Sequence, residues 1–432
     1  MCRKIFSIFL TIALPLLLLS GCGGTTSTNE NTTAAHAEDT TAAHAENTTA
    51  ASAENTTAAS SSDKIELTVW ESLNGPDAFI EQAGAKFTEQ NPDITIKFVN
   101  VELADAVSQI ALDGPAGIGP DLFAAPHDRL GSFVSDGHIL PTVNADTVSN
   151  EVLASCATAL TYEGTMYGYP ISAETYALYY NKALIAEEDV PTTWEGVKSF
   201  AETFNAANPG KHGFMMDVGN AYYSIIFTTS QDNRLFGPTG TDTSNTNINS
   251  PASIEGMQYF QGLRSILDSP AEDLATSVTD GAFSAGNVAL YISGPWNINP
   301  FSDAGIDFGV TTLPSLPGND TPVASFSGTR AMFVSAYSTH PEEAAKFAEF
   351  LLTPEMQKLR FDLTGALPST DVQVESPYVA GFTGQLEYAF PMPSIPQMGK
   401  FWDAMNAASA NIWNGADVQT ELDACNQAIL SE

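Results

Sequence analysis

Trp296 stands at a point in the sequence where a large apolar side chain is unexpected. The apolar run 288–292 predicts a strand, and the Ser-Gly-Pro sequence at 293–295 predicts the turn that ends it. Segments that follow a strand usually run over the surface and meet water. Trp296 is therefore either part of the core or an exposed platform for a flat, apolar ligand surface, and its neighbours leave both interpretations open.

His127, Asp128 and Arg129 form a second group with chemical potential. They follow the short run 119–124, which predicts a strand. Ligand sites in open α/β sheets lie beyond the carboxyl ends of strands. Asp128 could accept hydrogen bonds from ligand hydroxyl groups while Arg129 donates or orients the carboxylate. The alternative is a solvated pair of sequence neighbours, which contributes little.

The chain is strongly acidic, with 51 Asp and Glu against 16 Lys and Arg and a net charge of −35. Such a surface excludes nucleic acid as a partner and favours a neutral or cationic ligand. Paired carboxylates could serve a secreted glycosidase. However, the sequence contains no Gly-x-Ser-x-Gly, no His-Glu-x-x-His and no Cys with a suitable His motif. We expect no enzyme, cofactor or metal, and a carboxylate pair remains the open alternative.

Alternating strands and helices must position these groups. The runs 64–70 and 94–99 predict strands before the third at 119–124, and the helices between them span the apolar face 79–87 and the segment 104–112. This order implies a parallel sheet covered by helices. The pattern continues to the end of the chain, so both halves are predicted to be α/β.

Later segments carry their own signals. Strand-like runs occur at 176–180, 288–292 and 332–334. Thr192 and Glu195 have the spacing of a capping box that opens one helix. Thr353 is the expected N-cap of another, with Pro354 at its first helical position.

The N-terminus predicts a lipid anchor. Arg3 and Lys4 precede an apolar run at 5–19 that is too short for a spanning helix. Small residues then lead to Cys22, a pattern that resembles the lipobox of bacterial lipoproteins. The resemblance implies a signal peptide at 1–21 and acylation of Cys22, and acyl chains anchor a protein without spanning the membrane. The alternative is a plain secretory signal.

Residues 23–62 contain almost no bulky apolar side chains and cannot build a core. An eight-residue repeat begins at Glu30, Glu38, Glu46 and Glu54, which is shorter than the repeats of solenoids. We interpret 22–62 as the lipidated Cys followed by a disordered tether. The remaining length usually corresponds to two domains. Cys156 and Cys425 lie in predicted helices, and the sequence leaves open whether they form a disulfide.

Several segments together resemble the substrate-binding proteins of carbohydrate ABC importers, in particular the maltose/maltodextrin branch. The resemblance rests on these stretches: TVWESLNG at 68–75, GPDLFAAPHDRLGSFVSDGHILP at 119–141, YGYPISAETYALYYNKALI at 167–185, GAFSAGNVALYISGPW at 281–296 and IPQMGKFW at 395–402. It covers residues 63–432. It implies two α/β lobes joined at a hinge, with the ligand in the cleft between them. The first lobe would comprise 63–172 with 330–376, and the second 173–329 with 377–432.

The resemblance also implies which residues contact the ligand. A neutral sugar needs aromatic faces for its C–H patches and charged, planar groups for its hydroxyl edge. Trp70, Trp194 and Trp413 are expected in the core. The candidate site residues are Trp296, Trp402, Asp128, Arg129, Glu174, Tyr222, Glu71, Asn74 and Asn220. Relatives carry an aromatic residue two positions before the His of the His-Asp-Arg sequence, whereas this chain has Ala125. One stacking surface is therefore expected to be missing.

The expected function is hinge closure on maltose or maltodextrin, followed by delivery to an ABC permease. A closed state that shares the ligand between two lobes is favoured by its differential affinity. The protein is expected to be a monomer on the extracellular face of the membrane, or periplasmic if an outer membrane is present. The alternatives are a binding protein for another oligosaccharide, a secreted glycosidase and an adhesin for polysaccharide.

Overall fold

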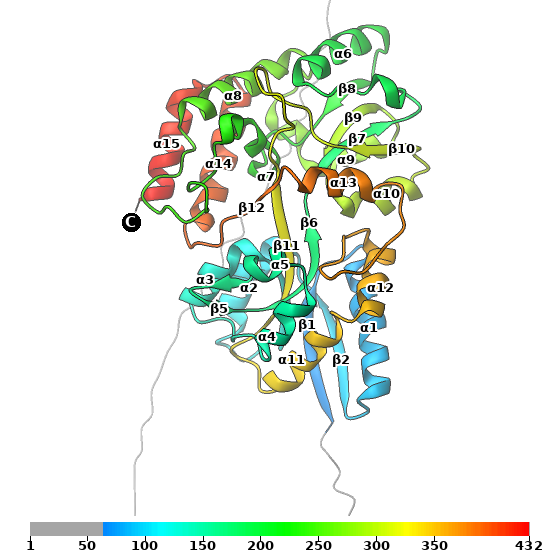
Figure 1. Ribbon diagram of the computed structural model, residues 1–432, viewed down its shortest axis with the longest axis vertical. Coiled ribbons are helices and arrows are strands. Elements are labelled where there is room, and N and C mark those ends of the chain that lie inside the picture. Colours follow the sequence, from blue (N-terminus) through cyan, green and yellow to red (C-terminus); the bar gives the residue numbers. More distant parts are fainter. Residues whose placement is uncertain (1–63, 432) are drawn as a thin grey trace, which may run out of the picture. The chain divides into compact units, whose positions relative to one another are not determined.

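The computed structural model describes residues 64–431, which form two lobes built on separate sheets (Figure 1). The predicted signal peptide at 1–21, the acylated Cys22 and the repeats at 30–61 lie outside the described residues. Within 64–431, no helix combines the length and the apolar character needed to cross a membrane.

A six-stranded sheet forms the centre of the first lobe. Its strands are β1 (Ile65–Glu71), β2 (Ile94–Asn100), β3 (Leu122–Pro126), β6 (Tyr169–Glu174), β11 (Phe326–Val334) and β12 (Phe390–Pro391). β1 pairs in parallel with both β2 and β3, which confirms the parallel arrangement predicted for the first three strands. β11 runs antiparallel to β3 and to β6. The carboxyl ends of β1 and β3 therefore lie at the same edge of the sheet.

Helices cover this sheet on the lower half of Figure 1. They are α1 (Pro76–Gln90), α2 (Leu103–Asp113), α3 (Leu130–Ser135), α4 (Ala145–Glu151), α5 (Ala154–Ala159), α11 (Pro341–Phe350) and α12 (Pro354–Thr364), with the small hairpin β4 (Thr161–Tyr162) and β5 (Thr165–Met166). In α1, Pro76 provides the first turn and Asp77 lies at the positive end of the helix dipole. Phe79, Ile80 and Phe87 are buried on one face of α1, as the apolar spacing predicted.

The second lobe is built on a four-stranded sheet in the order β10-β7-β9-β8. Its strands are β7 (Ala177–Asn181), β8 (His212–Met215), β9 (Val288–Ser293) and β10 (Phe308–Thr311). Around it lie α6 (Trp194–Ala207), α7 (Ala221–Ser224), α8 (Pro251–Gly262), α9 (Thr276–Ser284), α10 (Ile298–Asp303), α13 (Val379–Leu386), α14 (Met398–Trp413) and α15 (Val418–Leu430). The predicted strand at 288–292 is confirmed as β9.

Two helix starts test the capping predictions. α6 begins one residue later than expected: Thr193, not Thr192, is its N-cap, and the Thr193 hydroxyl accepts a hydrogen bond from the Gly196 N–H at 3.1 Å. The prediction of Thr192 is wrong because two adjacent threonines offer the same side chain, and only the backbone geometry selects between them. Thr353 is the N-cap of α12, with Pro354 first in the helix, as predicted.

The chain passes between the lobes along neighbouring strands. β6 of the first sheet is followed directly by β7 of the second, and β11 runs back beside β6 from the second lobe into the first sheet (Figure 1). A later passage leaves the first lobe after Leu367, which bridges Ala173 at the end of β6. These adjacent segments form the connection between the two lobes.

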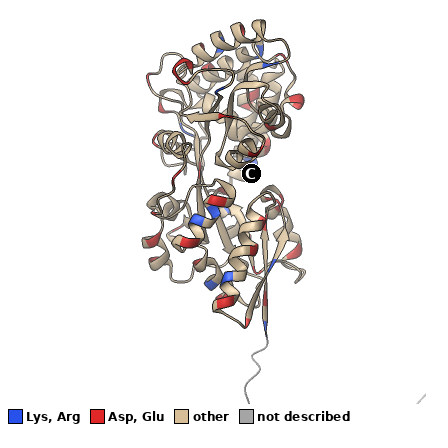
Figure 2. Cartoon of the chain, turned by 90° about the vertical axis from the view of Figure 1, so that its right-hand side faces the viewer, with Lys and Arg blue, Asp and Glu red and all other residues tan. Residues whose placement is uncertain are grey.

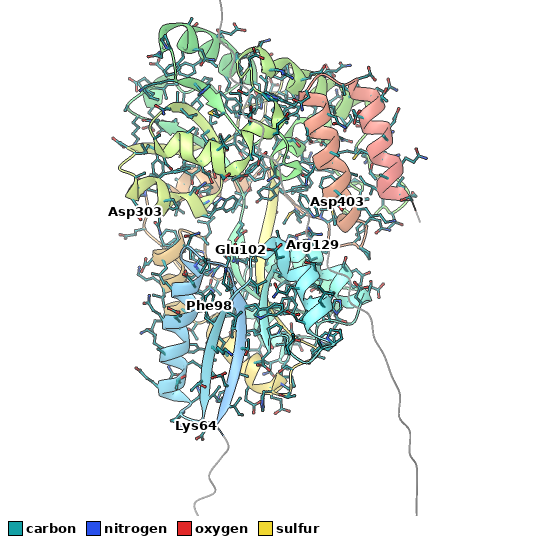
Figure 3. All side chains as sticks on the ribbon, turned by 180° about the vertical axis from the view of Figure 1, so that it is seen from behind. Lys64, Phe98, Glu102, Arg129, Asp303 and Asp403 are labelled. Carbon is teal, nitrogen blue, oxygen red and sulfur yellow. The ribbon has the colours of Figure 1, made fainter. Side chains whose placement is uncertain are left out.

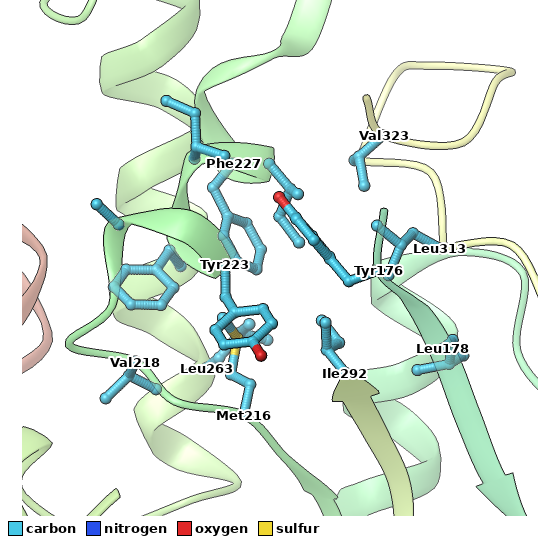
Figure 4. Close-up of a cluster of buried hydrophobic side chains, with 14 of the residues drawn as sticks. Tyr176, Leu178, Met216, Val218, Tyr223, Phe227, Leu263, Ile292, Leu313 and Val323 are labelled. Atoms are coloured by element: carbon cyan, nitrogen blue, oxygen red, sulfur yellow. The ribbon is translucent and has the colours of Figure 1, made fainter. Parts of the chain in front are cut away.

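Each lobe has its own hydrophobic core. The first contains Trp70, and the second contains Trp194 and Trp413, so all three tryptophans expected in the interior are buried there. Figure 4 shows part of the second core, where Tyr176, Tyr223 and Phe227 pack with aliphatic side chains such as Leu263 and Ile292. Burying one large aliphatic or aromatic side chain contributes about 1.5–3 kcal/mol, so these clusters are the main source of each lobe's stability.

Cys156 in α5 and Cys425 in α15 are both buried and unbonded. They belong to different lobes, so the disulfide that the sequence left open is absent from the described structure. Burial raises the pKa of both thiols above the ordinary value.

Two glycines of α8 provide a matched test of the second core. A Cβ at Gly256 would lie 1.6 Å from the Phe227 carbonyl oxygen, whereas a Cβ at Gly262 meets nothing within 4 Å. We expect Gly256→Ala to lower the free energy of unfolding by about 3 kcal/mol or more, because the helix must move away from Phe227. Gly262→Ala should leave it unchanged or raise it by up to about 1 kcal/mol. Thermal and urea unfolding of the two variants would contradict this packing if their stabilities were equal.

Candidate ligand-binding site

A cavity of about 710 Å³ lies where the two lobes meet, and its lining comes from both of them. Seven of the nine predicted site residues line it: Asn74, Asp128, Arg129, Glu174, Tyr222, Trp296 and Trp402. The lining that was not predicted is Ser72, Leu73, Pro76, Leu103, Pro126, Asp280, Gly281, Ser284, Asn297, Pro300, Phe301, Arg330, Arg360, Thr364, Ala366 and Met392. In Figure 3, Arg129 is labelled at the level where the lobes meet.

Asp128 and Trp402 connect the lobes across one wall of the cavity. Asp128 lies in the short 3-10 turn that follows β3 and is 2 % exposed. The indole Nε1–H of Trp402, on α14 of the second lobe, donates to Asp128 Oδ2 at 2.8 Å. Arg129 Nε lies 3.4 Å from the same oxygen, and its Cζ is 5.9 Å from the centre of the Trp402 ring. The three side chains form one charged and aromatic unit.

His127 holds this turn in place. Its Nδ1 accepts a hydrogen bond from the Thr329 N–H at 3.1 Å, so the Nε2–H donates to the Met392 carbonyl oxygen at 2.9 Å. Both bonds require the neutral imidazole with its proton on Nε2. Burial lowers the pKa of His127, because the charged form loses its water. His127 is therefore a positioning residue for Asp128 and does not line the cavity.

Trp296 lies in the 3-10 turn Pro295–Asn297 that follows β9, and it is partly buried. Its ring rests against Gly294: a Cβ there would come within 2.1 Å of the indole, so a larger residue would displace the Trp296 ring. The ring centre of Tyr222 lies 6.2 Å from that of Trp296. Tyr222 and Trp402 both pack on Phe326, at 6.2 and 6.0 Å between ring centres. The cavity therefore has an aromatic wall supported by β11.

Glu174 ends β6 and lines the cavity, and the Ser172 hydroxyl donates to its Oε1 at 3.1 Å. Asn74 follows β1 in a left-handed conformation with φ of 65°. Ala125, where the sequence resemblance implied a missing aromatic residue, is fully buried in β3 and paired with Ala331, and the neighbouring Pro126 lines the cavity. This part of the wall therefore offers no aromatic face.

Glu71 is one of the two predicted site residues that lie outside the cavity lining. It is 0 % exposed and does not line the cavity. Its carboxylate pairs with Arg330 through a short contact to Oε2, and Arg360 Nη1 lies 3.6 Å from Oε1. Ser72 donates its backbone N–H to Oε2 at 2.6 Å. Glu71 is used to hold two buried guanidinium groups, so it is unavailable to a ligand.

Asn220 is the second predicted site residue outside the cavity lining. Its Oδ1 accepts a hydrogen bond from the Tyr222 N–H at 3.0 Å and caps α7. The side chain lies outside the lining of the 710 Å³ cavity. Asn220 therefore contributes by fixing the start of the helix that carries Tyr222.

Asp280, Arg330 and Arg360 were missed from the sequence although they line the cavity. Asp280 accepts hydrogen bonds from the Tyr291 hydroxyl at 2.7 Å and from Asn297 Nδ2 at 2.6 Å, and burial raises the pKa of its carboxyl group. Burial and the neighbouring Arg330 lower the pKa of Arg360 to about 10, so it stays cationic at neutral pH. A charged residue inside the apolar run of β11 was the available signal for Arg330.

The charges around the cavity differ from those of the surface. Acidic residues are spread over both lobes in Figure 2, whereas the cavity holds Arg129, Arg330 and Arg360 beside its carboxylates. Such planar donors next to acceptors suit an uncharged ligand rich in hydroxyl groups. Within residues 64–431, no group of three or more His, Cys, Asp or Glu side chains converges to hold a metal ion.

Comparisons with known proteins identify relatives that bind solutes. The family model for bacterial extracellular solute-binding proteins matches residues 70–358. The chain is 31 % identical to a galactooligosaccharide-binding protein of Bacillus subtilis (strain 168), covering 84 % of this chain and 88 % of that protein. It is 30 % identical to a maltooligosaccharide ABC transporter solute-binding lipoprotein of Streptococcus pneumoniae (strain ATCC BAA-255 / R6), covering 79 % and 82 %.

Solved structures of sugar-binding proteins are also similar to this chain. A cyclo/maltodextrin-binding protein complexed with maltotetraose aligns with a TM-score of 0.72 and 32 % identity, covering 84 % of this chain and 96 % of that chain. Its two-lobed fold agrees with the arrangement of the sheets described above.

The Glu71 cluster yields a stability prediction. Glu71→Ala leaves two buried guanidinium groups without their carboxylate, and we expect the free energy of unfolding to fall by about 3–5 kcal/mol. Glu66→Ala on the same strand removes only an exposed partner of Lys97, at 3.8 Å, and should change it by less than about 1 kcal/mol. Equal stabilities of the two variants in denaturant unfolding would contradict the assigned role of Glu71.

His127 predicts a pH dependence. Its pKa is lower in the folded protein than the unfolded value of 6.5, so the unfolded state binds more protons between the two values. The resulting stabilisation is complete above pH 6.5 and is lost as the pH falls toward the folded pKa. We therefore expect the wild type to lose more stability than His127→Gln between about pH 7 and pH 5. Unfolding curves measured at both pH values give the loss of stability for each protein. An equal loss in the wild type and in His127→Gln would show that His127 does not titrate in this way.

Proposed function

Because the chain belongs to the bacterial extracellular solute-binding protein family, we propose that it captures linear maltodextrins between its lobes and delivers them to an ABC permease. Like the other members of its family, the protein is a binding protein and not an enzyme. The observation that carries the proposal is the cavity lining, in which the unit of Trp402, Asp128 and Arg129 lies together with the aromatic side chains of Trp296 and Tyr222. Aromatic faces suit the C–H patches of glucosyl rings, and the charged groups suit their hydroxyl edges.

The proposed roles follow from these contacts. Trp296, Trp402 and Tyr222 stack on the sugar rings. Arg129 donates to hydroxyl groups, while Asp128 and Glu174 accept from them, and Asn74 contributes a neutral amide. Hinge closure about the segments between β6 and β7 and along β11 brings the two walls onto the ligand. The lobe boundaries proposed are 63–172 with 330–376 and 173–329 with 377–432.

The anchor and the partner are also part of the proposal. The lipobox-like sequence before Cys22 and the name of the Streptococcus pneumoniae relative, a lipoprotein, support a lipid-anchored monomer on the extracellular face of the membrane. A tether of about 40 residues then keeps the lobes near a permease at a high effective concentration. Globomycin blocks cleavage of lipoprotein signal peptides. Cells treated with it should therefore accumulate the uncleaved precursor of this protein.

A second candidate ligand is a galactooligosaccharide. It is favoured by the Bacillus subtilis relative, at 31 % identity, and by Pro126 and Ala125 in place of an aromatic wall. Linear α-glucans and β-galactans present different curvatures to the same aromatic platforms. A calorimetric panel of maltotriose, maltotetraose and β-1,4-galactotriose separates the two assignments, since the proposal requires the α-glucans to bind more tightly.

Removal of an aromatic platform should weaken binding without unfolding the protein. We expect Trp296→Ala and Trp402→Ala each to raise the Kd for maltotetraose roughly 10- to 100-fold, because each loses a stacked face. Trp413→Phe in the core is the control and should bind like the wild type. Saturable quenching of tryptophan fluorescence and calorimetry each measure the Kd of every variant. Wild-type affinity in both alanine variants would exclude these residues from the site.

A further inference from the structure

In the lining of the cavity, two arginines share a single carboxylate. Arg330 on β11 is 9 % exposed, Arg360 on α12 is 1 % exposed, and both pair with the fully buried Glu71. Arg330 Nη2 also donates to the Ser72 hydroxyl at 2.7 Å. The cluster therefore contains one more positive than negative charge, held away from bulk water.

This cluster has donors without acceptors. Arg330 Nε, Arg360 Nε and Arg360 Nη1 are buried and make no hydrogen bond, although Arg360 Nη1 is 3.6 Å from the equally unpaired Glu71 Oε1. Leaving charged donors unpaired in a protein interior is costly, so such groups normally meet a partner. Both residues line the cavity, so a ligand bound there lies beside guanidinium groups whose hydrogen bonding is incomplete, although these three nitrogens are themselves shielded from it.

The lobes touch each other next to Arg360. Thr364, one turn further along α12, lines the cavity, and the following Gly365 has φ of 72°. A Cβ at Gly365 would lie 2.5 Å from the Pro295 carbonyl oxygen, directly before Trp296. Asn299 Nδ2 lies 3.5 Å from the Asp362 carbonyl oxygen. These contacts join the two lobes beside the arginine pair, so a sugar unit bound there lies against the junction of the lobes.

The charge of the whole cavity argues against an anionic ligand. The carboxylates of Asp128, Glu174 and Asp280 line it together with Arg129, so the excess charge of the cluster is balanced by acceptors on the other walls. Hydroxyl oxygens of an uncharged sugar can accept from guanidinium groups without repulsion by these carboxylates.

We infer that Arg330 and Arg360, positioned by Glu71, bind the hydroxyl groups of one terminal sugar residue and thereby fix the direction in which the oligosaccharide lies. This inference rests on the proposed function, because it assigns a subsite within the same cavity. Trp296 would then stack next to the terminal unit, and the chain would extend toward Asp128 and Trp402.

Ligands with modified ends test the subsite. The probes are maltotetraose, maltotetraitol, whose reducing end is opened, and maltotetraose with a 4,6-O-ethylidene group on its non-reducing end. We expect the wild type to bind one of the two modified ligands at least about tenfold more weakly than maltotetraose. Arg360→Met should bind maltotetraose roughly 10- to 100-fold more weakly and should no longer distinguish it from that modified ligand.

Controls separate recognition from folding. Lys358→Met on α12 removes an exposed ammonium group paired with Asp362 at 2.9 Å and should preserve both affinity and end discrimination. Arg360→Lys keeps the charge without the planar fork and should recover only part of the affinity. It replaces Arg360→Met in the titrations if the latter does not show a cooperative thermal transition.

The outcomes are distinct. A wild type that binds maltotetraose but treats all three ligands alike would overturn this inference alone. An Arg360 variant that retains wild-type affinity would also overturn it. A variant whose affinity falls by the same factor for all three ligands would do so too, because a uniform loss is a structural effect. A wild type without measurable binding of maltotetraose would overturn the proposed function and this inference with it.

Discussion

The antiparallel pairing of β6 with β11 is the constraint on which the rest of the structure depends. These two strands belong to the first sheet, yet each continues into the second lobe at one end. Their register sets Glu174 opposite Gly328 and Ser172 opposite Arg330, with an irregularity directly after Arg330. The connection between the lobes and the cavity are therefore built from the same backbone, and the site cannot be remodelled without altering how the lobes are joined.

Much of the fold was accessible from the sequence because the signals were local. The periodicity of α1, the apolar run of β9 and the turn before Trp296 each depend on residues close in sequence. The resemblance to a known family then indicated which ends of these elements meet. For this reason Asp128, Glu174, Trp296 and Trp402 could be predicted to lie together, and all four line one cavity.

Two predicted site residues, Glu71 and Asn220, lie outside the cavity lining because their side chains bond to other parts of the protein. Glu71 was expected to face the ligand, but its carboxylate forms an ion pair with Arg330, which is 259 residues away in the sequence. Asn220 was expected to bind the ligand, but an N-cap acceptor was needed at the start of α7. Arg360 and Asp280 were missed because a charged side chain in a helix is usually solvated, and only tertiary packing buries these two.

The hydrogen bond from Trp402 to Asp128 has a kinetic consequence. The indole belongs to α14 of the second lobe and the carboxylate follows β3 of the first, so separating the lobes must break this bond at 2.8 Å. Opening therefore has to break a contact made by the protein itself in addition to the contacts made with the sugar. The residence time of an oligosaccharide would then depend on this bond between the lobes as well as on the ligand's own contacts.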